Sequence, residues 1–264
     1  MKKISIWLLI SVLFLFACNS DKNDKKTELK VAASSIPHAE ILEVIKEDLA
    51  QENIDLDIVL ATDGIQVNQQ TADGQLDANF FQHTPYLEQV NKDSQLDLVN
   101  VVGVHIEPFG VYSTTLTSID DVKEGAKIAI PKDPVNFSRA LRLLAANHII
   151  TLKETDKENI VLEDITKNDK NITFIAVETA MLNRSLEDVD AAAINTNYAL
   201  EGGFNPLEDA LIIEGEASPY VNILAATREG AKTKEIQILK EALTSKKVKD
   251  FILQTYEGAV IPAF

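Results

Sequence analysis

The chain of 264 residues has few of the side chains that carry redox, metal or nucleophilic chemistry. It contains one cysteine and four histidines, and its formal net charge is −16. A single cysteine excludes a disulfide within the chain. The lack of a basic surplus argues against nucleic acid as a partner and against general adsorption to anionic lipid. The acidic residues are interspersed with lysines along helical patterns, which is typical of a solvated surface.

Long hydrophobic runs are also scarce, and the one that stands out is at the N-terminus. Lys2 and Lys3 precede an apolar run, 4–16, that is too short for a comfortable membrane span and is typical of an export signal. The run ends in LFAC, so Cys18 resembles the lipidated cysteine of a bacterial lipobox, before which the signal is cleaved. We predict a signal peptide over 1–17 and a disordered, lipid-anchored tether over 18–28.

Beyond the tether, strand patterns alternate with amphipathic helix patterns. The order strand, helix, strand, helix predicts an α/β fold with parallel sheets covered on both faces. Two long extended runs, 97–113 and 218–230, separate two such units, and the last two helices are expected to return to the first unit. This organisation resembles the two-lobed periplasmic-binding-protein fold, type II-like, with two hinge-crossing segments.

The predicted lobe 1 comprises 29–112 plus 226–264, and the predicted lobe 2 comprises 113–225. In open α/β sheets, ligands bind beyond the carboxyl ends of the strands, where strand-to-helix turns converge. The sequence therefore predicts a ligand cleft between the lobes.

One strand-to-helix junction is unusually rich in aromatic side chains. The segment ANFFQHTPYLEQV, 78–90, places these rings where loops usually carry small polar residues. Because consecutive strand residues point to opposite faces, we expect Phe80 to face the core and Phe81 the cleft. Phe81, His83 and Tyr86 are predicted to form an aromatic wall of the cleft.

Six blocks in order resemble one known family: DGQLDANFFQHTPYL, VHIEPFGVYS, KIAIPKDPVNFSRALRLL, DAAAINTNYAL, SPYVNI and GAVIP. The chain from about Leu29 to Phe264 is similar to the NlpA family of lipoproteins, the methionine-binding lipoproteins of ABC importers. The resemblance implies a non-catalytic receptor without a cofactor. It would capture methionine or a close relative outside the cytoplasmic membrane and deliver it to a permease driven by a cytoplasmic ATPase. We expect a monomer, lipid-anchored to the cell membrane on the extracytoplasmic or periplasmic face.

The resemblance also implies roles for polar residues. The family arginine that corresponds to Arg139 binds the ligand carboxylate, and the family asparagines that correspond to Asn197 and Asn222 bind the polar end of the amino acid. Without the resemblance, the residues favour Arg139 as a surface arginine or a member of an internal ion pair over Arg139 as a ligand-binding residue. Asn195 is assigned to capping a helix, the commoner role of asparagine after a strand. His105 is expected on the hinge side of the cleft, together with Glu107.

Gly64 stands where the family usually has a tyrosine of the pocket wall. Its small size predicts a larger or wetter pocket, so a methionine-containing dipeptide, a methionine derivative or another apolar amino acid stays an open alternative to L- or D-methionine.

Two other classes of protein fit the sequence less well. A metal-binding receptor could use His38, His83, His105 and Glu107, but there is no paired histidine spacing and no histidine-rich tract, and we predict no metal site. A hydrolase would need a nucleophile with an orienting base, and neither G-x-S-x-G nor a similar arrangement occurs.

Overall fold

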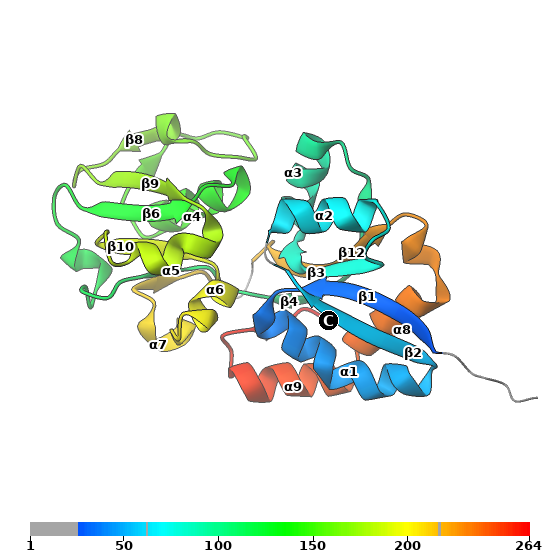
Figure 1. The fold of residues 1–264 in the computed structure, drawn as a ribbon. Helices are drawn as coiled ribbons and strands as arrows, with labels where there is room; N and C mark the ends of the chain where they lie inside the picture. The colour runs from blue at the N-terminus through cyan, green and yellow to red at the C-terminus, as the bar shows by residue number, and fades with distance from the viewer. Residues whose placement is uncertain (1–25, 62, 216–217) are drawn as a thin grey trace, which may run out of the picture.

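Two α/β lobes lie side by side in the computed structural model, which describes residues 26–61, 63–215 and 218–264 (Figure 1). The predicted signal peptide and Cys18 lie outside the described residues, as does most of the predicted tether. No helix in the described ranges is long and apolar enough to cross a membrane.

The first lobe is built on a six-stranded sheet in the order β13-β4-β12-β3-β1-β2. Strands β1, β2 and β3 are parallel, and β12 runs antiparallel to both β3 and β4. The bounds of the strands are β1 Thr27–Ala33, β2 Ile54–Leu60, β3 Ala78–His83, β4 Leu98–Ile106, β12 Val221–Thr227 and β13 Ile261–Pro262.

Helices cover both faces of this sheet. Their bounds are η1 Ser35–Ala39, α1 Glu40–Gln51, α2 Gly64–Ala72, α3 Thr84–Ser94, η5 Gly230–Lys232, α8 Lys234–Leu243 and α9 Lys246–Tyr256. The core on one face joins α1 to the two C-terminal helices through side chains such as Ile45, Leu239 and Ile252, all of which are fully buried. The prediction that the last helices return to the first unit is confirmed.

The second lobe contains a five-stranded sheet in the order β11-β5-β10-β6-β9 and a small hairpin. Its strands are β5 Gly110–Tyr112, β6 Lys127–Pro131, β7 Thr151–Leu152, β8 Ile165–Lys167, β9 Thr173–Val177, β10 Ala191–Ile194 and β11 Ile212–Ile213. Its helices are η2 Ile119–Asp121, α4 Pro134–Ala146, η3 Leu162–Asp164, η4 Thr179–Met181, α5 Leu182–Ser185, α6 Thr196–Glu201 and α7 Pro206–Asp209. The parallel neighbours β9, β6 and β10 direct their carboxyl ends toward one edge.

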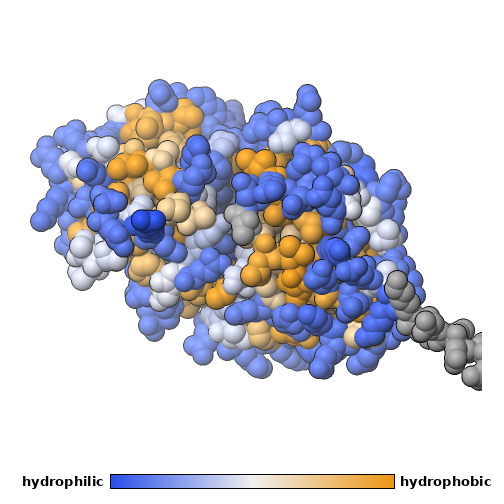
Figure 2. All heavy atoms as spheres, in the orientation of Figure 1, coloured by the Kyte–Doolittle hydropathy of each residue, from blue (hydrophilic) through white to orange (hydrophobic). Residues whose placement is uncertain are grey.

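The chain passes from the first sheet to the second between β4 and β5, and returns between β11 and β12. The two predicted crossings are therefore present, but their positions differ from the predicted boundaries. Residues 110–112 belong to the second sheet and 221–227 to the first. The first extended run is interrupted in the sequence at Pro108 and Gly110, but only strand pairing shows where each run changes sheets. Hydrophilic side chains predominate on the face drawn in Figure 2, with apolar patches on both lobes.

Candidate ligand-binding site between the lobes

A cavity of about 560 Å³ lies between the lobes, at the carboxyl ends of strands from both sheets. It is bounded by the carboxyl end of β3 and the start of β12 on one side and by the starts of α4 and α6 on the other. Six predicted ligand-binding residues line this cavity: Phe81, His83, Tyr86, Arg139, Asn197 and Asn222. The fold thus brings together side chains that are spread over more than half of the chain.

Arg139 sits on the second turn of α4, a helix whose start is dictated locally. Asp133 accepts a hydrogen bond from the backbone N–H of Asn136, and Pro134 occupies the first helical turn, where proline is well tolerated. This start buries Arg139 at 2% exposure while it still borders the cavity.

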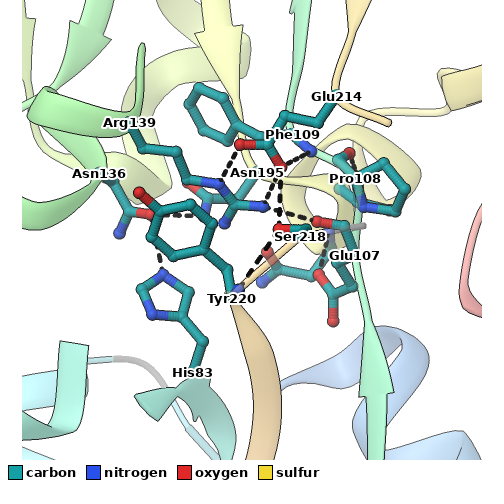
Figure 3. Close-up of polar contacts among 12 residues, drawn as sticks. His83, Glu107, Pro108, Phe109, Asn136, Arg139, Asn195, Glu214, Ser218 and Tyr220 are labelled. Atoms are coloured by element: carbon teal, nitrogen blue, oxygen red, sulfur yellow. Dashed lines mark hydrogen bonds and ion pairs between the residues drawn. The ribbon is translucent and has the colours of Figure 1, made fainter. Parts of the chain in front are cut away.

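The guanidinium of Arg139 is held by groups from both crossings (Figure 3). Its Nε and Nη2 donate to the carboxylate of Glu214 at 2.8 and 2.6 Å, and Nη2 also donates to the carbonyl oxygen of Glu107 at 2.9 Å. The rings of Tyr220 and Phe109 lie 4.0 and 5.1 Å from the guanidinium carbon. Arg139 therefore forms the internal ion pair that its residue type favoured, and it also borders the cavity. Glu214 gave no signal in the sequence.

Three asparagines, Asn136, Asn195 and Asn197, line the cavity together with Arg139, and hydrogen bonds fix their positions. The Nδ2 of Asn195 donates to Oδ1 of Asn136, and the Oδ1 of Asn195 is buried without a partner among the described residues. Asn195 occupies the N-cap position of α6, but its side chain does not cap the helix, contrary to prediction. The side chain of Asn195 bonds instead to Asn136, which lies in the first turn of α4. The sequence did not indicate Asn136 as a site residue. The backbone N–H of Asn197 donates to Oε2 of Glu107.

His83 links the two lobes across the cavity. Its Nδ1 accepts the backbone N–H of Tyr86, which caps α3, and its Nε2 donates to Oδ1 of Asn136 at 3.1 Å. Burial, reinforced by the nearby charge of Arg139, lowers the pKa of His83 to about 3. The imidazole is thus neutral at physiological pH, and both ring nitrogens are used within the protein.

The aromatic wall has the predicted orientation. Phe80 is fully buried and packs edge-on against His38, whereas Phe81 borders the cavity and meets Tyr86 at 6.3 Å between ring centroids. Gly64, the first residue of α2, lets both rings approach: an added Cβ would lie 2.8 Å from Phe81 Cε2 and from the Tyr86 hydroxyl. In this chain, the two rings occupy space that a side chain at position 64 would need.

His105 does not line the cavity, contrary to prediction. It is fully buried on β4, and Glu107 stands between it and the cavity, because β4 ends at Ile106 and the next residue turns toward the site. His105 Nε2 and Glu107 Oε1 are 2.8 Å apart, and His38 Nε2 lies 3.4 Å from the same oxygen. His38 Nε2 also donates to Oδ1 of Asn222 at 3.2 Å.

His38, His105 and Glu107 have donor atoms within 4.8 Å of one another. These side-chain types can hold metals, although no sequence spacing indicated such a group. The 2.8 Å separation is a hydrogen-bond distance, and His38 is hydrogen-bonded to an amide as well. We therefore interpret the group as a buried hydrogen-bonded cluster, the hinge cluster, rather than as a metal centre.

A second hollow of about 590 Å³ lies farther out between α3 and α4. Its polar lining mixes both signs of charge, with Glu88, Lys92, Arg142 and Glu158. Its lining contains none of the seven predicted ligand-binding residues, and it also includes Tyr220 and Val135. The inner cavity, where buried polar groups converge, is the better candidate site.

The two lobes and the cavity between them give this chain the architecture of a two-lobed solute-binding protein. The family model for the NlpA lipoprotein matches residues 29–264, and the chain belongs to that family. It is 38% identical to the methionine-binding lipoprotein MetQ of Bacillus subtilis over 99% of both chains. It is 37% identical to the membrane lipoprotein TpN32 of Treponema pallidum, over 94% of this chain and 91% of the relative.

Solved structures agree with this assignment. A nutrient-binding protein from Burkholderia cenocepacia bound to methionine superposes with a TM-score of 0.86 at 36% identity, covering 89% of this chain and 100% of the other. The predicted two-lobed α/β fold and the predicted family are confirmed.

Proposed function

We propose that this protein is a non-catalytic receptor that binds methionine in the cavity between its lobes and delivers it to an ABC importer. The observation that carries the proposal is the convergence of a buried arginine, amide groups and an aromatic wall in one cavity. A free amino acid needs a cation for its carboxylate, acceptors for its ammonium and an apolar wall for its side chain. The methionine-binding relative and the methionine-bound solved relative support the same ligand.

Each lining residue then has a role that its contacts allow. Arg139 has Nη1 left to address the ligand carboxylate, since Nε and Nη2 are used by Glu214 and Glu107. Asn222 is held by His38 through its oxygen, so its Nδ2 is available to donate to the same carboxylate. Asn197 lies at the same polar end of the cavity.

At the other end, Phe81 and Tyr86 pack against the thioether, a polarizable group that suits ring edges. His83 contributes ring surface and holds the lobes together, because its nitrogens are already engaged. The Oδ1 of Asn195, which has no hydrogen-bond partner among the described residues, is an acceptor for the ligand's ammonium group.

The proposal includes anchoring and partners. The signal is cleaved before Cys18, the lipid on that cysteine holds the monomeric receptor at the outer face of a membrane, and the permease with its cytoplasmic ATPase receives the ligand. When its signal peptide is removed, the Cys18→Ser variant should no longer fractionate with membranes after a high-salt wash, and its ligand affinity should be unchanged. Retention of the variant in the membrane fraction would show a second attachment.

Mass spectrometry of small molecules released by denaturing undialysed protein is the direct test of the ligand. We expect methionine, which calorimetry should then show to bind at one site per chain. Competition with D-methionine and with a methionine dipeptide ranks the alternatives. Release of another compound, together with no heat on adding methionine, would refute the proposed ligand.

A further inference from the structure

Glu107 is the residue in which the two lobes and the polar end of the cavity meet. Its side chain is 6% exposed and borders the cavity. Its Oε1 lies against His105, its Oε2 accepts from the backbone of Asn197, and its carbonyl oxygen accepts from Arg139. These contacts join β4, α6 and α4, so the carboxyl group occupies a defined position beside the ligand's polar end.

The cations near this carboxyl group are unavailable to neutralise it. Arg139 is paired in two hydrogen bonds with Glu214. The Nδ1 atoms of His38 and His105 are buried and have no hydrogen-bond partner within the described ranges. Burial away from water disfavours the charge of an imidazolium at either position, so both rings are neutral.

Charges farther away do not change this balance. The other titratable groups that interact with Glu107 are Tyr198 and Glu201 of α6 and Tyr256 of α9, none of which is a cation. Burial, the largest effect, raises the pKa of Glu107, and it lowers the pKa of His38 to about 4 and that of His105 to about 3. A proton on Oε1 has an acceptor in His105 Nε2 at 2.8 Å, once that ring carries its own proton on Nδ1.

We propose that ligand capture is linked to a proton: the carboxyl group of Glu107 is protonated in the ligand-free receptor and releases its proton to solvent when the ligand's ammonium group enters beside it. The inference rests on the proposed function, since it requires a ligand with an amino group next to its carboxylate. Glu107 is then the residue that selects for that amino group. Arg139 selects for the ligand's carboxylate.

The direction of the pH effect follows from this exchange. Bound ammonium favours the ionised carboxyl group, so the pKa of Glu107 falls on binding. As the pH drops through the pKa of the ligand-free state, the ligand must compete with a proton, and affinity decreases by up to tenfold for each pH unit. Above that pKa, affinity should not depend on Glu107 titration.

Calorimetry of the chain from residue 18 with Cys18→Ser tests the linkage without changing the site. Methionine is titrated at each pH from 4.5, the ordinary value for glutamate, up to neutrality, in two buffers of different ionisation enthalpy. The difference in heat counts the protons released per ligand bound. We expect a release that approaches one proton in the acidic part of this range, with affinity falling as pH falls.

Three further measurements assign the proton to Glu107. Glu107→Gln should abolish the release, flatten the pH profile and weaken methionine at least tenfold. The des-amino analogue 4-(methylsulfanyl)butanoate, which lacks the ammonium, should bind this variant at least as well as it binds the unaltered site. Glu201→Gln is the matched control, because Glu201 interacts with Glu107 but does not line the cavity, and it should keep the proton release.

The possible results separate this inference from the proposed function. Tight methionine binding with no proton release at any pH overturns the linkage and leaves the receptor function standing. Proton release that persists in Glu107→Gln also overturns it. Zinc that binds stoichiometrically, competes with methionine and is lost in Glu107→Gln would make the cluster a metal centre, against this inference. Absence of methionine binding at every pH refutes the proposed ligand and the linkage with it.

Discussion

The guanidinium of Arg139 and the carboxylate of Glu214 form a two-point ion pair, although 75 residues separate them in the sequence. The pair lies between the cavity and the return crossing, and Tyr220 stacks on it at 4.0 Å (Figure 3). Glu214 therefore orients Arg139, which borders the cavity, and neither Glu214 nor Glu107 uses the remaining nitrogen of the fork, Nη1. The arginine is a fixed element of the site rather than a mobile surface charge.

Replacing Arg139 by alanine removes the cation from two carboxylates, that of the ligand and that of Glu214. We expect methionine affinity to fall by roughly 2–4 kcal/mol, about 30- to 1,000-fold in dissociation constant. The melting temperature should fall as well, because breaking a buried ion pair leaves an uncompensated charge. Calorimetry and thermal unfolding measure the two effects, and an unchanged affinity would remove Arg139 from the site. Arg142→Ala, in the outer hollow, is the matched control and should leave affinity unchanged.

Replacing His83 by alanine removes the hydrogen bond to Asn136 that joins the lobes. We expect methionine affinity to fall by about 1 kcal/mol, the net value of such a bond, because the closed arrangement loses a contact. Gln89→Ala removes another bond between the lobes, to Asn159, outside the inner cavity, and should cost less. Equal losses in both variants would contradict a special role of the bond beside the inner cavity. Small-angle scattering of the methionine complex measures closure of the lobes directly.

At Gly64 the structure changes the expected outcome of adding a side chain. Its φ is not in the left-handed region, and it opens α2 after the cap Asp63, so Gly64→Ala should not strain the backbone. The new Cβ would push Phe81 and Tyr86 into the cavity. We expect methionine to bind several-fold more weakly, about 1 kcal/mol, with thermal stability kept. Combining Gly64→Ala with Tyr86→Phe removes the hydroxyl that the new Cβ would meet, so part of the lost affinity should return. If no affinity returns, the displacement of Phe81 alone causes the loss.

The buried histidines should make the fold sensitive to acid. His38 and His105 have pKa values lowered to about 4 and about 3, whereas in the unfolded chain the value is 6.5. Between these limits the unfolded state binds more protons, so stability is lost as the pH falls from 6.5 toward 4. Each histidine contributes a slope of up to about 1.4 kcal/mol per pH unit.

Urea unfolding at a series of pH values measures this slope. His105→Gln should reduce it by the contribution of one proton, whereas His148→Gln, at an exposed position, should leave it unchanged. A slope that is the same in the His105 variant and in the unaltered chain would contradict the assignment of a neutral buried ring.

Much of the fold could be predicted because it depends on neighbours along the chain. Strand and helix patterns placed β3 before α3 and Phe81 on the cavity side, since the alternation of a strand needs no distant information. Of the six cavity-lining residues, Phe81, His83 and Tyr86 were found from the aromatic strand-to-helix junction, whereas Arg139, Asn197 and Asn222 were found through the family motifs. His105 was misplaced because two residues on one extended run share a face only while the strand lasts, and β4 ends between His105 and Glu107.

The sequence by itself determined the order of elements, the helix starts at Pro134 and near Pro85, the two crossings and the family of the chain. Each of these is encoded within a few residues or in a run of motifs. Only the tertiary structure decided that Glu214 holds Arg139, that His83 reaches Asn136, and that His38 orients Asn222 over a separation of 184 residues. The physical reason is that hydrogen bonds and burial act between atoms a few ångströms apart, and the pairing of sheets and lobes, not distance along the chain, decides which atoms meet.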